Sequence, residues 1–236
     1  MNGLLYFIVA RNTLGFSSTS DIFCIEVRFN SGSLTTGSLR SSAYPRGLPM
    51  DKWRLLSIPA VLDDSGVSQV IGDELGTQDD NVWRLFEYNE GTGSFNDNPG
   101  QFTPGDSYWL YQRVGNNLSL SAPAGQTGNM CGTDLTIKPG WNLIGSPYSF
   151  SLPLVLDPVQ FYGTITYGVE AEEWSNVVSE MDPWNGYAVY NRTSNDLNIS
   201  LDPTGCDTAR LVRTLDEEGW LMTLQARGND YQDSFN

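Results

Sequence analysis

The side chains best suited to chemistry in this sequence are carboxylates and aromatic rings, because its 236 residues include no histidine. Without an imidazole, the chain cannot form a Ser-His-Asp hydrolase, a Cys-His protease or a His-ligated zinc or haem site. Carboxylates gather at Asp63–Asp64, Asp79–Asp80, Asp97 and Glu170–Glu173. A carboxylate pair could hydrolyse a glycosidic bond, and an Asp/Asn loop could bind Ca²⁺. No segment has EF-hand spacing, and with 28 acidic residues in the chain most clusters are expected to be solvated loops.

The seven tryptophans offer a different chemistry, because an indole face can stack on the apolar face of a sugar ring. Two of them are candidates for ligand contact. Trp109 has an alanine, Ala188, at the matching place of a repeated segment, and Trp184 lies in a Pro-Trp-Asn-Gly turn. The tryptophans that recur in strand-like segments are expected to fill the core: Trp53, Trp83, Trp141 and Trp174.

A Tyr-x-Arg pattern occurs twice, and residues two apart in a strand lie on the same face. Each arginine can therefore stack on its tyrosine or bind a ligand carboxylate, and the alternative is a surface cation–π pair or an ion pair with an acidic loop. No residue is assigned a catalytic role. With the two tryptophans, the candidate binding residues are Trp109, Tyr111, Arg113, Trp184, Tyr190 and Arg192.

The three cysteines, Cys24, Cys131 and Cys206, are far apart and include no Cys-x-x-Cys pair. This spacing excludes a zinc knuckle and a thioredoxin-type redox motif. Cys131 and Cys206 each follow a similar strand pair, so they are the preferred disulfide in an oxidising compartment. The alternative is three buried thiols.

An internal repeat supplies the elements that must position these side chains. Residues 108–121 align without a gap on residues 187–200, with six of the fourteen positions identical. Upstream, Trp53–Pro59 matches Trp141–Pro147. Each copy has a Trp-containing strand and a proline turn, then a variable segment with a second tryptophan, then a Tyr-rich hairpin, which predicts two homologous β units.

Composition supports the same fold class. The sequence has 24 Gly and 12 Pro and only 17% charged residues, as expected for many short strands joined by turns. Apolar spacing from Val67 to Leu75 predicts one helix, with Asp64 or Ser65 placed to cap it and Gly76 to end it. We therefore predict an all-β chain of tandem homologous units, sandwich or barrel-like, with at most one or two short helices.

The predicted domain organisation has five parts. They are terminal strands in 1–29, a Ser/Gly/Pro-rich linker in 30–51, β units in 52–124 and 135–202, and the start of a further β domain in 207–236.

Two resemblances bear on this organisation. The segment Tyr6 to Ser20, with its Ala-x-Asn-x-x-Gly turn, resembles the last two strands of a fibronectin type III domain, although Leu4 stands where the corner tyrosine is expected. Because two strands do not make a stable domain, the chain is expected to begin inside a larger protein. Residues 52–202 are similar to the Trp-Asn-Leu-Ile-Gly-x-Pro repeats of large secreted multidomain proteins of bacteria. That resemblance implies an extracellular or cell-surface location, and its motif carries no catalytic role that could be transferred to residues of this chain.

Charge limits the partners. The net charge of −15 opposes binding to nucleic acid or to an anionic membrane surface. No stretch approaches the ~18 apolar residues of a membrane span. We expect a non-catalytic spacer and binding module of a larger protein, with a polysaccharide or a cell-surface protein as partner and no cofactor apart from Ca²⁺. The alternatives are a glycoside hydrolase or polysaccharide lyase, which a cleft with two buried acids would favour, and a spacer without a ligand.

Overall fold

The structure is a computed structural model, and it divides the chain into two units, Met1–Cys206 and Asp207–Asn236. The residues that it describes are 4–6, 9–11, 17–19, 23–36, 47–116, 118–168, 172–203, 224–228 and 231–235. The second unit contains one antiparallel hairpin, β19 (Leu224–Gly228) with β20 (Tyr231–Phe235). It lies in the region where the sequence predicts the start of another β domain.

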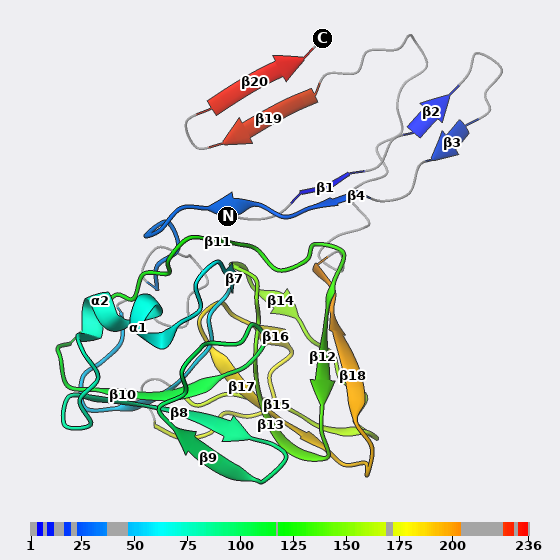
Figure 1. The fold of residues 1–236 in the computed structure, drawn as a ribbon. Helices are drawn as coiled ribbons and strands as arrows, with labels where there is room; N and C mark the ends of the chain where they lie inside the picture. Colours follow the sequence, from blue (N-terminus) through cyan, green and yellow to red (C-terminus); the bar gives the residue numbers. More distant parts are fainter. Residues whose placement is uncertain are drawn as a thin grey trace. The chain divides into compact units, whose positions relative to one another are not determined.

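The first unit is all-β with two short helices, so the predicted fold class is confirmed (Figure 1). In the described ranges its sheets are antiparallel and open, and none closes into a barrel. The first large sheet has the order β6-β10-β8-β9 and consists of β6 (Trp53–Leu56), β10 (Tyr108–Gln112), β8 (Trp83–Asn89) and β9 (Ser94–Asp97). The second has the order β13-β17-β15 and consists of β13 (Gly140–Gly145), β17 (Gly186–Asn191) and β15 (Phe161–Ile165).

Smaller sheets cover the inner faces of these two. A three-stranded sheet consists of β5 (Arg28–Phe29), β11 (Gly125–Gln126) and β7 (Val61–Leu62). Two pairs are β12 (Thr133–Ile137) with β18 (Leu197–Leu201), and β14 (Leu152–Pro153) with β16 (Glu180–Met181). Each large sheet thus has its own buried hydrophobic cluster.

The N-terminal segment, where terminal strands are predicted, forms two antiparallel strand pairs. Its pairs are β1 (Leu4–Tyr6) with β4 (Phe23–Ile25) and β2 (Val9–Arg11) with β3 (Ser17–Thr19). The following strand β5 pairs with β11, and Phe29 is buried in the first cluster. The expected linker is also packed in its described parts, because Leu34 and Leu48 are buried there and Leu48 pairs with Leu118.

The predicted helix is present as α1 (Val67–Val70) and α2 (Gly72–Leu75), with the apolar side chains buried as expected. It ends at Gly76, whose φ of 76° suits glycine. The predicted cap is wrong, because the N-cap is Gly66 and makes no side-chain cap bond. Asp64 instead accepts a hydrogen bond from the Gly66 amide at 3.0 Å.

The two aligned segments have the same strand register. Tyr111 pairs with Trp53 in the first sheet, and Tyr190 pairs with Trp141 in the second. These are matching positions of the sequence alignment. The second tryptophan of each copy does not occupy matching positions. Gln112 pairs with Trp83 in the first sheet, whereas its counterpart Asn191 pairs with Phe161 in the second. The second-copy counterpart of Trp83 is therefore Phe161 and not Trp174.

The two sheets meet through reciprocal contacts. Leu56 bridges Asn185, and Ile144 bridges Asp106. In the alignment Leu56 corresponds to Ile144, and Asp106 corresponds to Asn185. Each copy therefore makes the same contact with the other. Such an arrangement is that of a twofold, isologous interface, here within one chain.

Close packing at the junction depends on glycine. A Cβ added to Gly145 would lie 2.1 Å from the Cβ of Ser57, its counterpart in the first copy. A Cβ added to Gly186 would lie 2.7 Å from the Oγ of Ser107, again its counterpart. Residues that contact their own counterparts lie on the axis that relates the two copies. No helix in the described ranges is long and apolar enough to cross a membrane.

Candidate aromatic binding site

The outer face of the joined sheets carries aromatic side chains, because strand residues alternate between the two faces. In β8, Trp83 and Leu85 are buried toward the core, whereas Phe86 and Tyr88 alternate with them and are only half-buried. The same alternation places Trp109 of β10 on the outer face. The sequence therefore builds a core on one side of the sheet and an aromatic surface on the other.

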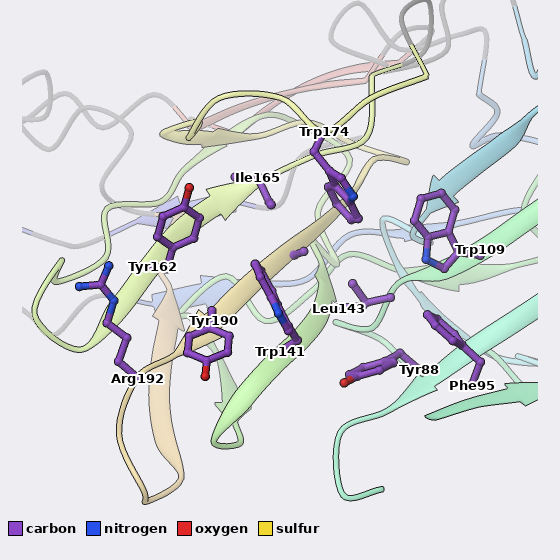
Figure 2. Close-up of a pocket in the computed structure, with 11 residues that line it drawn as sticks. Tyr88, Phe95, Trp109, Trp141, Leu143, Tyr162, Ile165, Trp174, Tyr190 and Arg192 are labelled. Atoms are coloured by element: carbon purple, nitrogen blue, oxygen red, sulfur yellow. The ribbon is translucent and has the colours of Figure 1, made fainter. Parts of the chain in front are cut away.

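A cavity of about 810 Å³ opens on this face, and residues of both copies line it (Figure 2). Its walls are seven aromatic side chains, three aliphatic ones and one arginine. They are Tyr88, Phe95, Trp109, Trp141, Leu143, Tyr162, Ile165, Trp174, Ala188, Tyr190 and Arg192. None of these residues carries a carboxylate.

The centre of the cavity lies over the junction of the two copies. Leu55 and its counterpart Leu143 form a small buried cluster there with Ala188, and Trp109 packs against it. This cluster closes the floor of the cavity and fixes Trp109.

Trp174 is held by edge-to-face ring contacts. Its indole centroid lies 5.8 Å from that of Trp109 and 5.7 Å from the ring of Tyr167. Tyr167 and Trp109 are in turn 5.0 Å apart, so the three rings contact one another. A bridge between Tyr167 and Trp174 and a hydrogen bond from the Ser175 amide to the Thr166 carbonyl hold the supporting loop.

Trp141 projects from β13 into the middle of the cavity. Its ring is 5.1 Å from Tyr190 and 6.4 Å from Tyr162, both edge to face. In Figure 2 these two tyrosines lie on one side of Trp141, and Tyr88 and Phe95 lie on the other. Since 42% of Trp141 is exposed, a ligand can reach it.

Three of the predicted binding residues come together in this cavity: Trp109, Tyr190 and Arg192. Tyr111 and Arg113 do not line it and instead bind Asp51. Trp184 is fully buried in the first cluster, so the expectation that a ligand contacts it is contradicted.

Of the four tryptophans predicted to fill the core, one is buried and three are partly exposed. Trp83 is buried, as expected, with 2% exposed. The core prediction is wrong for Trp53, Trp141 and Trp174, each of which is about two-fifths exposed.

Several cavity residues were not predicted, among them Tyr88, Phe95 and Tyr162. The alternation in β8 is a signal that could have placed Tyr88 on the outer face. Phe95 and Tyr162 come from strands whose position beside the cavity depends on the pairing of β9 with β8 and of β15 with β17.

Cys131 is disulfide-bonded. Its predicted partner, Cys206, lies outside the described residues, so this pairing stays a prediction. Among the described residues, no group of three Cys, Asp or Glu side chains could hold a metal ion.

Among the residues that the structure describes, two acids have a raised pKa, and neither lines the cavity. Burial, together with the nearby charges of Glu90 and Glu87, raises the pKa of Asp106 from 3.8 to about 7. Burial also raises the pKa of Glu90. Neither acid belongs to the cavity lining, so the aromatic walls supply no carboxyl pair of the kind that a glycosidase needs.

The raised pKa of Asp106 predicts a pH-dependent stability. The contribution of Asp106 to the free energy of unfolding is fully present below about pH 4, the pKa of this carboxyl in the unfolded chain. It is lost as the pH rises toward 7, because in that range the carboxyl ionises freely only in the unfolded state. Asp106→Asn should raise the free energy of unfolding at pH 8 by about 1–3 kcal/mol and change it little at pH 4. The amide fits there, since the counterpart residue is Asn185. Urea unfolding at pH 4, 6 and 8 measures this effect.

The control is Asp134→Asn, which changes an exposed carboxylate on β12. It should keep the pH dependence of the wild type. Equal pH profiles for wild type and Asp106→Asn would refute the assignment.

Taken together, the cavity offers ring faces, tyrosine hydroxyls and one guanidinium, which suits binding better than bond cleavage. A comparison of the chain with family models, with curated proteins and with solved structures finds no match.

Proposed function

We propose that the protein is a non-catalytic carbohydrate-binding module and that sugar rings stack in its aromatic cavity. The observation that carries this proposal is the exposure of Trp141, Trp174 and Tyr162, each 42–47%, around one cavity. Soluble proteins rarely keep a contiguous apolar patch of this kind on the surface without a binding role. Covering it would be favourable by roughly 25 cal/mol per Å² of apolar area.

The chemistry of the walls favours a sugar over a purely apolar ligand. A pyranose has an apolar C–H face for the indoles and hydroxyl groups at its edge. Tyr88, Tyr162 and Tyr190 line the cavity, and within the described part of the chain their hydroxyls make no hydrogen bond. They are therefore able to donate to and accept from sugar hydroxyls.

Other features support a non-catalytic role outside the cell. The cavity lining has no carboxylate, and the acids with raised pKa lie elsewhere. The disulfide of Cys131 fits an oxidising compartment. We include an extracellular or cell-surface location, and attachment to a larger protein, in the same proposal.

A glycan array probed with the full chain tests this function. We expect binding to one class of polysaccharide fragments, and Trp141→Ala or Trp174→Ala should weaken it at least about tenfold, as for a central stacking residue. The matched control is Trp53→Ala. Trp53 is the first-copy counterpart of Trp141 and is similarly exposed, yet it lies outside the cavity.

Trp53→Ala should leave binding unchanged. An array without any bound glycan, or a loss of binding in Trp53→Ala alone, would contradict the proposal.

A further inference from the structure

The first copy contains a bound carboxylate of its own. The Tyr111 hydroxyl donates to Oδ1 of Asp51 at 3.0 Å, and Nε of Arg113 donates to the same oxygen at 3.1 Å. The ring of Tyr111 lies 5.2 Å from that of Trp53. In the first copy, a tyrosine and an arginine thus bind the carboxylate of Asp51, and the tyrosine ring packs against the indole of Trp53.

The second copy has the same three side chains but no such acid. Tyr190 and Arg192 are the counterparts of Tyr111 and Arg113, and Tyr190 lies 5.1 Å from Trp141. The position that corresponds to Asp51 is Pro139. The acid that occupies the first copy is therefore missing from the sequence of the second.

Arg192 is available to a ligand. Its Nη1 donates to the Pro158 carbonyl at 3.1 Å, and its guanidinium lies 5.9 Å from the centroid of Tyr162. Among the described residues it forms no ion pair, whereas Arg28, Arg84 and Arg113 each do. Nε and Nη2 have no hydrogen bond there, which leaves donors free for a carboxylate.

The place of Arg192 in the cavity is also suitable. It is the one charged residue of the cavity wall, and with Tyr162 it also lines a second cavity of about 310 Å³. A ligand that stacks on Trp141 can thus extend past the guanidinium. A guanidinium binds a carboxylate through two parallel N–H bonds, which is the strong form of this contact.

We infer that the ligand is an acidic saccharide and that Arg192 binds the carboxylate of a uronic acid whose ring stacks at Trp141. This inference rests on the proposed carbohydrate binding and narrows it to a substrate class. The net charge of −15 does not oppose it at short range. At physiological salt, charges more than about 8 Å away are largely screened, so the nearest guanidinium dominates.

The test uses an array that pairs uronic-acid oligosaccharides with their carboxyl-reduced, neutral counterparts. We expect the acidic member of each bound pair to bind at least tenfold more tightly than the neutral one. Arg192→Gln should remove this preference, so that the acidic and the neutral member of each pair bind about equally. Arg113→Gln, the matched control, should leave the preference unchanged, because Arg113 lies outside the cavity.

The outcomes separate this inference from the proposed function. Equal binding of acidic and neutral members by the wild-type protein overturns the acidic preference and leaves carbohydrate binding in place. A preference that survives in Arg192→Gln overturns the role of this arginine. The absence of any bound glycan overturns carbohydrate binding itself.

Discussion

Replacing Trp184 by alanine is expected to lower the free energy of unfolding by about 3–5 kcal/mol, the range for a buried aromatic side chain. The Trp184 indole is fully buried in the first hydrophobic cluster, although its backbone belongs to the second copy. Its carbonyl also accepts a hydrogen bond from the Ser57 amide at 3.2 Å. This backbone bond does not depend on the side chain, so the expected loss comes from the cavity that the missing ring leaves in the first cluster. A urea titration of the full chain, followed by far-UV circular dichroism, measures the change.

Trp141→Ala provides the contrast in the same experiment. Because Trp141 lies on the outer face, its loss should cost less than about 1 kcal/mol of stability while it weakens binding. A destabilisation by Trp141→Ala as large as that by Trp184→Ala would show that the two faces have been assigned wrongly.

Gly145→Ala is expected to destabilise the protein by at least about 2 kcal/mol, because overpacking at a tight contact forces the backbone apart. The new Cβ would lie 2.1 Å from Ser57 Cβ and 3.0 Å from the Asp106 carbonyl oxygen. Neither atom is the end of a flexible side chain. Thermal unfolding and urea unfolding should both register the loss.

An exchange of the two counterparts should rescue this variant. In the double variant Ser57→Gly and Gly145→Ser, the crowded Cβ at position 57 is gone. In the wild type the Ser57 hydroxyl donates to the carbonyl of Asn185 at 2.8 Å. Asp106 is the first-copy counterpart of Asn185, so the hydroxyl of a serine at position 145 would lie near the Asp106 carbonyl. We expect most of the stability to return. If the double variant is no more stable than Gly145→Ala, the junction is not reciprocal in the way described.

Gly100→Ala is the matched control for the glycine. Its added Cβ would meet no atom within 4 Å. The stability of this variant should stay within about 0.5 kcal/mol of the wild type.

Much of the local structure was predictable from the sequence, because it depends on periodicity and turn residues. The aligned Tyr-rich segments predicted the strands β10 and β17, which have matching registers. The predicted hairpin is wrong for the second copy, because β17 pairs with β13 and β15 whereas the following strand β18 pairs with β12. The apolar spacing from Val67 to Leu75 gave the helical pair. These features arise from neighbours in the chain, which a sequence pattern records directly.

The exposure of the tryptophans was not predictable, because it depends on how the two copies meet. Trp53 and Leu55 lie on the same face of β6, and that face is the outer one. Leu55 is buried because it meets its counterpart Leu143 at the junction, whereas Trp53 lies two residues further along and is exposed. Trp184 is buried by packing into the other copy's core. No periodicity within one strand encodes these contacts.

The most direct test of the account is an NMR titration that follows the indole N–H signals of the tryptophans while an oligosaccharide bound on the array is added. We predict that the signals of Trp109, Trp141 and Trp174 shift together, and that those of Trp53, Trp83 and Trp184 stay in place. A titration in which the saccharide binds, yet Trp53 shifts while Trp141 and Trp174 do not, would contradict the assignment of this cavity as the binding site.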